Sequence, residues 1–144
     1  MGLESLTETG LTAAFTTATN ALAVAYRPHY RCAMLDDDPT AERELRRYPF
    51  VEIVAHPNVP DSHKSTFRHI PVDLVFATHK DDDRKGLGLK ALYEACRAVI
   101  DTESGVTITG YSVIGILIQE GGQREVDENE QRITLPLIIK VCAA

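Results

Sequence analysis

The densest group of chemically versatile residues in the chain is the stretch HKDDDRKG, which runs from His79 to Gly86. It offers an imidazole and carboxylates, which are suitable ligands for Mg²⁺, Mn²⁺ or Zn²⁺. Consecutive residues rarely converge on one ion, however, and the alternating acids and closing glutamate of an EF-hand are missing. The pattern is more typical of a strand end, a polar turn and a helix that begins at Leu87. We expect one aspartate to cap that helix and the others to favour the positive end of its dipole.

Two glycines in the same region, Gly86 and Gly88, do not make a phosphate site. A dinucleotide-binding fingerprint needs a further glycine where this chain has Ala91, and the GKS or GKT of a P-loop is missing. The neighbouring aspartates would also repel a phosphate. No GxSxG elbow occurs, and the adjacent Ser62 and His63 are poorly placed for a catalytic triad. The sequence therefore offers no strong signature of nucleotide binding or nucleophilic catalysis.

Histidines form a second candidate group around the first predicted pair of strands: His56, His63, His69 and His79. Two of them, His56 and His69, are candidates for cross-strand neighbours. Solvated or stacked histidines are the favoured interpretation, because no supporting pattern of carboxylates accompanies them; a metal site is the alternative that stays open.

The segment EGGQREVDENEQ, residues 120–131, is rich in acidic side chains: Glu120, Glu125, Asp127, Glu128 and Glu130. Its simplest interpretation is a solvated hairpin loop. A sharper interpretation is a loop at an interface or in the lumen of an assembly, where negative charge repels nucleic acid and lets it slide past.

The composition describes one ordinary globular domain. With 144 residues, 44% hydrophobic and 25% charged, the chain can bury enough surface to fold without a metal or a disulfide. Its net charge of −6 argues against nucleic-acid binding. No apolar run is long enough to span a membrane, and the acidic N-terminus lacks the basic n-region of a secretory signal. The three cysteines are expected to be free thiols, with Cys96 and Cys142 among apolar neighbours.

Apolar periodicity predicts two main helices, over residues 11–26 and 86–101. Thr7 or Thr9 is expected to cap the first helix, and Arg27-Pro28 to end it. Its apolar stripe comprises Leu11, Phe15, Ala18, Leu22 and Ala25. The stripe of the second helix comprises Leu89, Leu92, Cys96 and Val99. A short polar helix over residues 40–47 is expected to follow Asp38-Pro39.

Strands are predicted over residues 50–56, 66–79, 105–119 and 132–141. Apolar and polar residues alternate in the second and fourth of these, which indicates one buried face. The third is apolar on both faces, as is typical of a central strand covered on both sides. Pro71 has no N–H to donate and favours an edge or a bulge. The last two strands are expected to pair as an antiparallel hairpin around the acidic loop.

We therefore expect a single α+β domain over residues 1–144. Its sheet is mainly antiparallel and four-stranded, with room for an extra short strand, and the two main helices pack on one face.

The order of elements resembles the small tail-terminator, or tail-completion, proteins of long-tailed bacteriophages. The resemblance runs from Leu11 to Val141. An N-terminal helix leads into YPFVEIVA, and VDLVFATHKDDD follows. The helix LKALYEACRAVI comes next, and the hairpin YSVIGILIQEGG…RITLPLIIKV closes the pattern. The segment from His29 to Arg47 departs from the family pattern because it is long and interrupted by proline.

The resemblance implies a structural protein of the virion, not an enzyme, with no cofactor. Such proteins form a ring, typically a hexamer, that caps the tail tube and joins it to the neck or connector. The implied partners are further copies of the chain, the tube, neck and connector proteins, the sheath where there is one, and DNA passing through the lumen without sequence-specific binding. Assembly would take place in the host cytoplasm, without a membrane.

On this hypothesis the interface elements are the turn Lys80–Lys85, the loop Glu120–Gln131 and the N-terminal residues. The individual residues expected there are Asp81, Asp82, Asp83, Arg84, Glu120, Arg124, Glu125, Asp127, Glu128 and Glu130. The alternative is a small metal-dependent enzyme that uses His79 with Asp81 to Asp83, or the histidines of the first hairpin.

Overall fold

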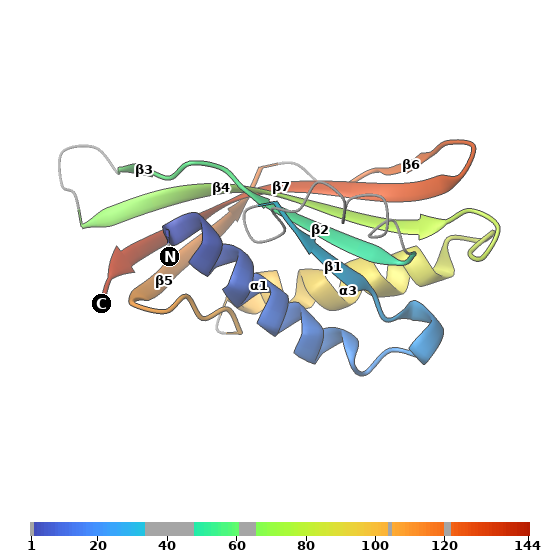
Figure 1. Ribbon diagram of the computed structural model, residues 1–144, viewed down its shortest axis with the longest axis horizontal. Helices are drawn as coiled ribbons and strands as arrows, with labels where there is room; N and C mark the ends of the chain where they lie inside the picture. The colour runs from blue at the N-terminus through green and yellow to red at the C-terminus, as the bar shows by residue number, and fades with distance from the viewer. Residues whose placement is uncertain (1, 34–47, 61–65, 104, 120–121) are drawn as a thin grey trace.

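Two α-helices cover one face of a mixed β-sheet in the computed structural model of the chain (Figure 1). The structure describes residues 2–33, 48–60, 66–103, 105–119 and 122–144. The predicted α+β class and the packing of both helices on one face are confirmed. The prediction of four strands is wrong, because the described residues form seven; the sheet is mixed, and its pairing is mainly antiparallel as expected.

In chain order the elements are α1 (Leu3–Thr19), the 3-10 helix η1 (Val24–Tyr26), β1 (His29–Cys32), β2 (Phe50–Ala55), β3 (Val59–Pro60), β4 (Phe67–His79), α3 (Leu87–Thr102), β5 (Tyr111–Ile118), β6 (Arg124–Val126) and β7 (Glu130–Ala143). The strand order is β1-β2-β4-β7-β5, with β3 beside β4 and β6 beside β7. Only β1 and β2 run parallel among these pairs; the others are antiparallel.

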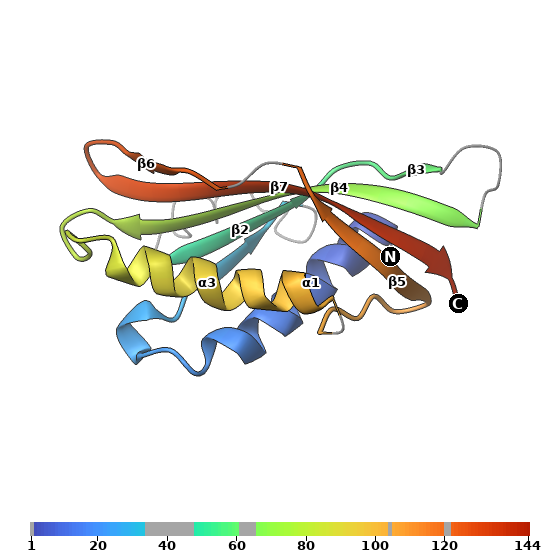
Figure 2. The ribbon, with the colours of Figure 1, turned by 180° about the vertical axis from the view of Figure 1, so that it is seen from behind.

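The long strands β4 and β7 form the centre of the sheet and pair from Phe67 opposite Cys142 to His79 opposite Glu130. Their alternation is confirmed, since one side chain in two is buried toward the helices. Seen from behind, α3 lies along this face (Figure 2). The buried side chains of the two strands are Ile70, Val72, Leu74, Phe76, Ile133, Leu135, Leu137, Ile139 and Val141.

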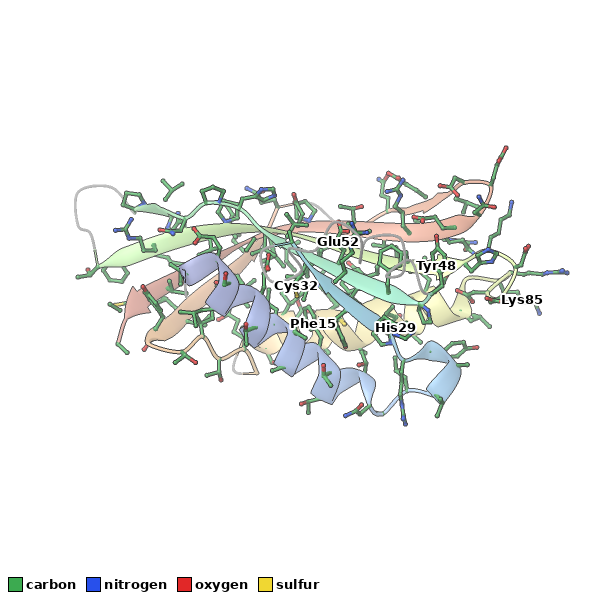
Figure 3. The ribbon with its side chains drawn as sticks, viewed as in Figure 1. Phe15, His29, Cys32, Tyr48, Glu52 and Lys85 are labelled. Carbon is green, nitrogen blue, oxygen red and sulfur yellow. The ribbon has the colours of Figure 1, made fainter. Side chains whose placement is uncertain are left out.

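The first helix begins and ends earlier than its apolar stripe predicts. It starts at Leu3, so Thr7 and Thr9 lie inside it rather than at its cap. Their hydroxyls donate to the carbonyls of Leu3 and Ser5, as threonines do within a helix. Phe15 of α1 and Cys32 of β1 are buried in the core between helix and sheet (Figure 3).

Pro71 lies in a central strand whose pairing with β7 passes through it without a register shift, so the prediction of an edge or a bulge is wrong. Its backbone faces the neighbouring strand β2 just where β2 ends, and its carbonyl accepts the N–H of His56. The next partner on that side, β3, pairs only with Arg68 and His69. The missing N–H of the proline therefore faces an interruption between β2 and β3, where no ladder hydrogen bond is lost.

The prediction that β5 is a central strand is also wrong. Within the described ranges, β7 is the one strand that pairs with β5. Its outward side chains Ile114 and Leu117 are 45% and 65% exposed. It is an edge strand with one buried face, and it forms the predicted antiparallel hairpin with β7.

Some predictions fall outside the described residues, among them the polar helix at 40–47 and its start at Asp38-Pro39. Three short strands, β1, β3 and β6, were not predicted. The cysteines in the structure are free: Cys32 and Cys96 are buried and Cys142 is half-buried. Burial raises the pKa of the Cys96 thiol to about 12.

Two glutamates of α1 join the helix to the end of β2. The carboxylate of Glu8 is fully buried and accepts the backbone N–H of Ala55 at 3.0 Å. One turn earlier, Glu4 accepts both the backbone N–H and the side-chain amide of Asn58, at 2.8 and 2.7 Å. The backbone N–H of Asn58 holds the pKa of Glu4 below its ordinary value.

The close approach of α1 to the segment after α3 gives a first prediction. A methyl group at Gly10 would lie 2.2 Å from the carbonyl oxygen of Thr107. We expect Gly10→Ala to destabilise the fold by about 1–3 kcal/mol, although alanine is the better helix former. The matched control is Gly115→Ala, where a methyl group would meet nothing within 4 Å. Urea unfolding followed by circular dichroism measures both, and equal stability of the two variants would contradict the close contact.

A second prediction concerns acid stability. Because the folded-state pKa of Glu4 lies below its ordinary value of 4.5, the ionised carboxylate stabilises the folded chain. That stability is fully present above the ordinary pKa and is lost as the pH falls through the lowered folded-state pKa. The difference in unfolding free energy between the wild type and Glu4→Gln should therefore be constant near neutral pH and shrink in acid. A difference that does not change with pH would argue against this role.

Candidate functional site at one end of the sheet

Two segments predicted as interface elements lie side by side at the end of the β4–β7 pair. The backbone N–H of Lys80 donates to the carbonyl of Asn129 at 2.9 Å. The turn after β4 and the hairpin of β6 and β7 therefore share one end of the molecule (Figure 1). We call residues Lys80–Lys85 and Arg124–Arg132 together the acidic end. Of the residues predicted there, Glu120 lies outside the described part of the chain.

The carboxylate of Asp83 organises the turn, and it is only 8% exposed. One oxygen accepts the N–H of Gly88 at 2.9 Å. The other accepts the N–H of Leu89 and the hydroxyl of Thr78, both at 2.9 Å. The bonded N–H groups belong to the first turn of α3, so Asp83 does the work of an N-cap side chain although it precedes the helix by several residues. The prediction that one aspartate caps this helix is confirmed.

The hairpin is fastened to the same turn through Gln131, which is buried. Its side-chain amide donates to the backbone carbonyl of Asp83, and its side-chain oxygen accepts Nε of Arg124 at 2.8 Å. The Arg124 side chain also covers Gly86, whose φ of 71° lies in the left-handed region that favours glycine. Asp83 and Arg124 are thus structural supports of the acidic end, while Asp81, Asp82 and Arg84 are exposed.

The acidic side chains of the hairpin differ in what they contact. Asp127 accepts the backbone N–H groups of Asn129 and Glu130, which lower its pKa and close the turn. Glu125 and Glu130 lie 3.8 and 3.7 Å from Nε of Arg132. Glu128 is exposed. Counting the charged side chains from Arg124 to Arg132, two are basic and four acidic, so the hairpin carries a net charge of −2.

Sequence reasoning missed Tyr48, because nothing in its neighbourhood along the chain indicates a site. Its hydroxyl donates to Glu130 at 2.7 Å, from a residue 82 positions away. Its ring packs edge-on against the imidazole of His79, with 5.4 Å between ring centroids. Tyr48 therefore connects the acidic hairpin to the end of β4 (Figure 3).

Two hollows flank the acidic end. The first, which we call the tyrosine hollow, has a volume of about 320 Å³. Its polar and aromatic walls are Tyr26, Tyr48, Thr78, His79, Asp82 and Asp83. The second has a volume of about 280 Å³ and lies on the sheet face opposite the helices. It is lined by charged residues, among them the ion pair of Arg31 and Glu52 at 3.3 Å.

The geometry does not favour the alternative hypothesis, a metal-dependent enzyme. The carboxylate of Asp83 already accepts three hydrogen bonds within the turn and helix, and Nδ1 of His79 accepts the backbone N–H of Asp81 at 3.2 Å. In the first hairpin His56 pairs with Asp73 at 2.7 Å, whereas His69 stands opposite Val59 and Lys140. His56 and His69 are therefore not the cross-strand neighbours that the sequence suggested. Within the described ranges no three histidine, cysteine or acidic side chains are grouped to hold a metal ion.

Comparison of the sequence with protein-family models finds no matching family, and comparison with curated proteins finds no match. Among the described residues, no helix has both the length and the apolar character needed to cross a membrane.

The cap made by Asp83 leads to a third prediction. In Asp83→Ala the hydroxyl of Thr78 and two N–H groups of α3 lose a buried partner, which should cost about 1–3 kcal/mol of unfolding free energy. Asp81→Ala removes the same charge from an exposed position in the same turn and should change stability by less than about 0.5 kcal/mol. Chemical unfolding monitored by circular dichroism compares the pair. Equal losses in both variants would show that the net charge of the turn matters rather than the cap.

Proposed function

We propose that the chain is a ring-forming structural protein of a long-tailed bacteriophage, the tail terminator that caps the tail tube and joins it to the neck or connector. It acts through subunit interfaces rather than through catalysis. The observation that carries the proposal is the convergence of two sequence-distant charged segments on the acidic end. The coarse architecture, an α+β sheet with both helices on one face, is compatible with the resemblance of the sequence to that family.

The acidic end has the properties of a surface that meets another protein. Buried hydrogen bonds of Asp83 and Gln131 hold the turn that carries its exposed charges. Asp81, Asp82, Arg84 and Glu128 are all exposed and take no part in the core. A rigid surface of mixed charge can select its partner and its orientation by electrostatic complementarity.

Exposed apolar side chains on the strands β5 and β6, which pair with opposite halves of β7, give independent support for assembly. Ile114 and Leu117 on β5 and Val126 on β6 are 45%, 65% and 51% exposed. Both strands lie on the same side of β7. An apolar edge strand is a liability for an isolated subunit, because it can pair with other chains without control. In a closed ring the neighbouring subunit covers such an edge, and head-to-tail contacts repeat around the axis.

The net charge of the hairpin agrees with a position near passing DNA. A surface that carries more carboxylates than basic groups does not retain the phosphate backbone. The same charge leaves the acidic end free to meet basic groups on a tube or neck protein. On this proposal the DNA is a passing neighbour and the proteins are the binding partners.

The proposal predicts oligomers that depend on the acidic end. Electron microscopy of the purified protein, alone and with tail tubes, should show uniform rings, free or seated on one end of each tube. Glu125→Lys combined with Glu128→Lys should abolish rings or tube capping, because both substitutions reverse charge at the exposed hairpin. Unfolding free energy should fall by no more than about 1 kcal/mol, since surface ion pairs contribute little.

The control is Glu94→Lys, which reverses one charge on the exposed surface of α3. Its rings should be unaffected. A protein that remains monomeric and leaves both tube ends bare would refute the proposed function. Equal loss of assembly in the hairpin and α3 variants would instead remove the acidic end from the interface.

A further inference from the structure

The tyrosine hollow is made by four separate parts of the chain. Ala25 and Tyr26 come from η1, Tyr48 and Pro49 precede β2, Thr78 and His79 end β4, and Asp82 and Asp83 belong to the turn. Its volume of about 320 Å³ is at the lower end of the range for small-molecule sites. Because its walls come from distant segments that the fold brings together, it is a formed cavity and not a gap within one loop.

The charge of its walls selects the ligand. Among the described residues that line the hollow, two are carboxylates and none is a lysine or an arginine. Asp83 receives its hydrogen bonds from a hydroxyl and two backbone N–H groups, all of them neutral donors. Of these three bonds, Oδ1 of Asp83 accepts one, from the N–H of Gly88. A carboxylate oxygen can accept two hydrogen bonds, so Oδ1 can take a second donor. Asp82 is exposed at the rim.

The aromatic side chains that line the hollow also favour a cationic ligand. The ring of Tyr26 packs on the first turn of α3, where a methyl group at Gly88 would lie 2.9 Å from it. Tyr48 is held by its hydrogen bond to Glu130 and by its contact with His79. Both tyrosines line the hollow, and aromatic rings attract cations. Lys85, a cation of the same turn, is exposed and does not line the hollow (Figure 3).

These walls fit one chemical group better than the others. An anion would be repelled by Asp82 and Asp83, and a neutral apolar molecule would leave their charge uncompensated. A guanidinium is flat, permanently charged and able to donate N–H groups to a carboxylate while its face stacks on an aromatic ring. We propose that the tyrosine hollow binds a guanidinium group of the kind carried by arginine. The site stands on its own geometry and does not depend on ring formation.

The test uses the intact protein labelled with ¹⁵N and titrated with N-acetyl-arginine amide at millimolar concentration. Backbone amide signals of Thr78, His79, Gly88 and Leu89 should shift and saturate. N-acetyl-citrulline amide has nearly the same shape without the charge and should bind at least tenfold more weakly. N-acetyl-lysine amide, with an ammonium group, should also be weaker than the arginine probe. Absence of a saturable shift, or equal binding of the arginine, lysine and citrulline probes, would overturn the proposal.

The sequence supplies a matched pair of variants. Asp82→Asn removes a carboxylate that lines the hollow and should weaken the arginine probe at least fivefold. Asp81→Asn removes the neighbouring exposed carboxylate, which does not line it, and should leave affinity within twofold of the wild type. Equal weakening in both would show attraction to the general charge of the turn and would refute a specific site.

A further titration tests whether the guanidinium group belongs to a protein partner or to a small molecule. An acetyl-Gly-Arg-Gly amide peptide carries the side chain as a protein partner would, and agmatine carries it as a small metabolite would. Stronger binding of the peptide assigns the site to a protein partner, and stronger binding of agmatine assigns it to a small molecule. Ring assembly is measured separately, so loss of the guanidinium site and failure of the proposed function give different results.

Discussion

The buried carboxylate of Asp83 is the contact on which the acidic end depends. A carboxylate removed from water is costly unless its charge is met by hydrogen bonds. Here the donors come from Thr78 at the end of β4 and from the first turn of α3. The backbone carbonyl of the same residue accepts the side chain of Gln131 in β7. One residue thus fixes the relative positions of a helix and two strands, and the exposed charges of the turn are arranged around it.

The other helix, α1, is also joined to the sheet by a hydrogen bond between a carboxylate and a backbone N–H. The strand β1 ends at Cys32, so Ala55 of β2 has no β1 residue to bond on that side. The carboxylate of Glu8 accepts the free N–H in place of a strand. Apolar packing between helix and sheet is not directional, whereas these hydrogen bonds between carboxylates and backbone amides are. They define how far each helix is shifted along the sheet, which apolar contacts alone define less sharply.

Strong alternation made most of the core predictable. β4, β7 and α3 agree with the sequence because each buries one regular face, and β2 does so over a shorter stretch. β5 was misjudged because the pairing register shifts between Val113 and Gly115. Val113 packs against the core before the irregularity, and Ile116 and Ile118 after it, so the inward positions change from odd to even. A strand with such a shift looks apolar on both faces when it is read as a regular one.

The remaining differences come from tertiary contacts that local sequence does not contain. The short strands β1, β3 and β6 exist only because longer strands lie beside them. Among three adjacent aspartates, nothing local shows that Asp83 is the buried one, since the choice depends on where Thr78 and α3 come to lie. Tyr48 joins the site through a partner 82 residues away. The acidic loop could be identified from its composition, but its contact with the turn at Lys80 could not.

The two faces of β7 carry different kinds of side chain. From Ile133 to Val141 its buried side chains face the helices, while Arg132 and Thr134 point to the other face and are exposed. Near the acidic end the same strand provides Gln131 to the core and Glu130 to Tyr48. Substitutions at outward positions therefore change the exposed charge while the hydrogen bonds of Asp83 keep the scaffold in place. For the interface proposed above, this arrangement allows specificity to change without rebuilding the fold, because its exposed charges and its buried supports are different residues.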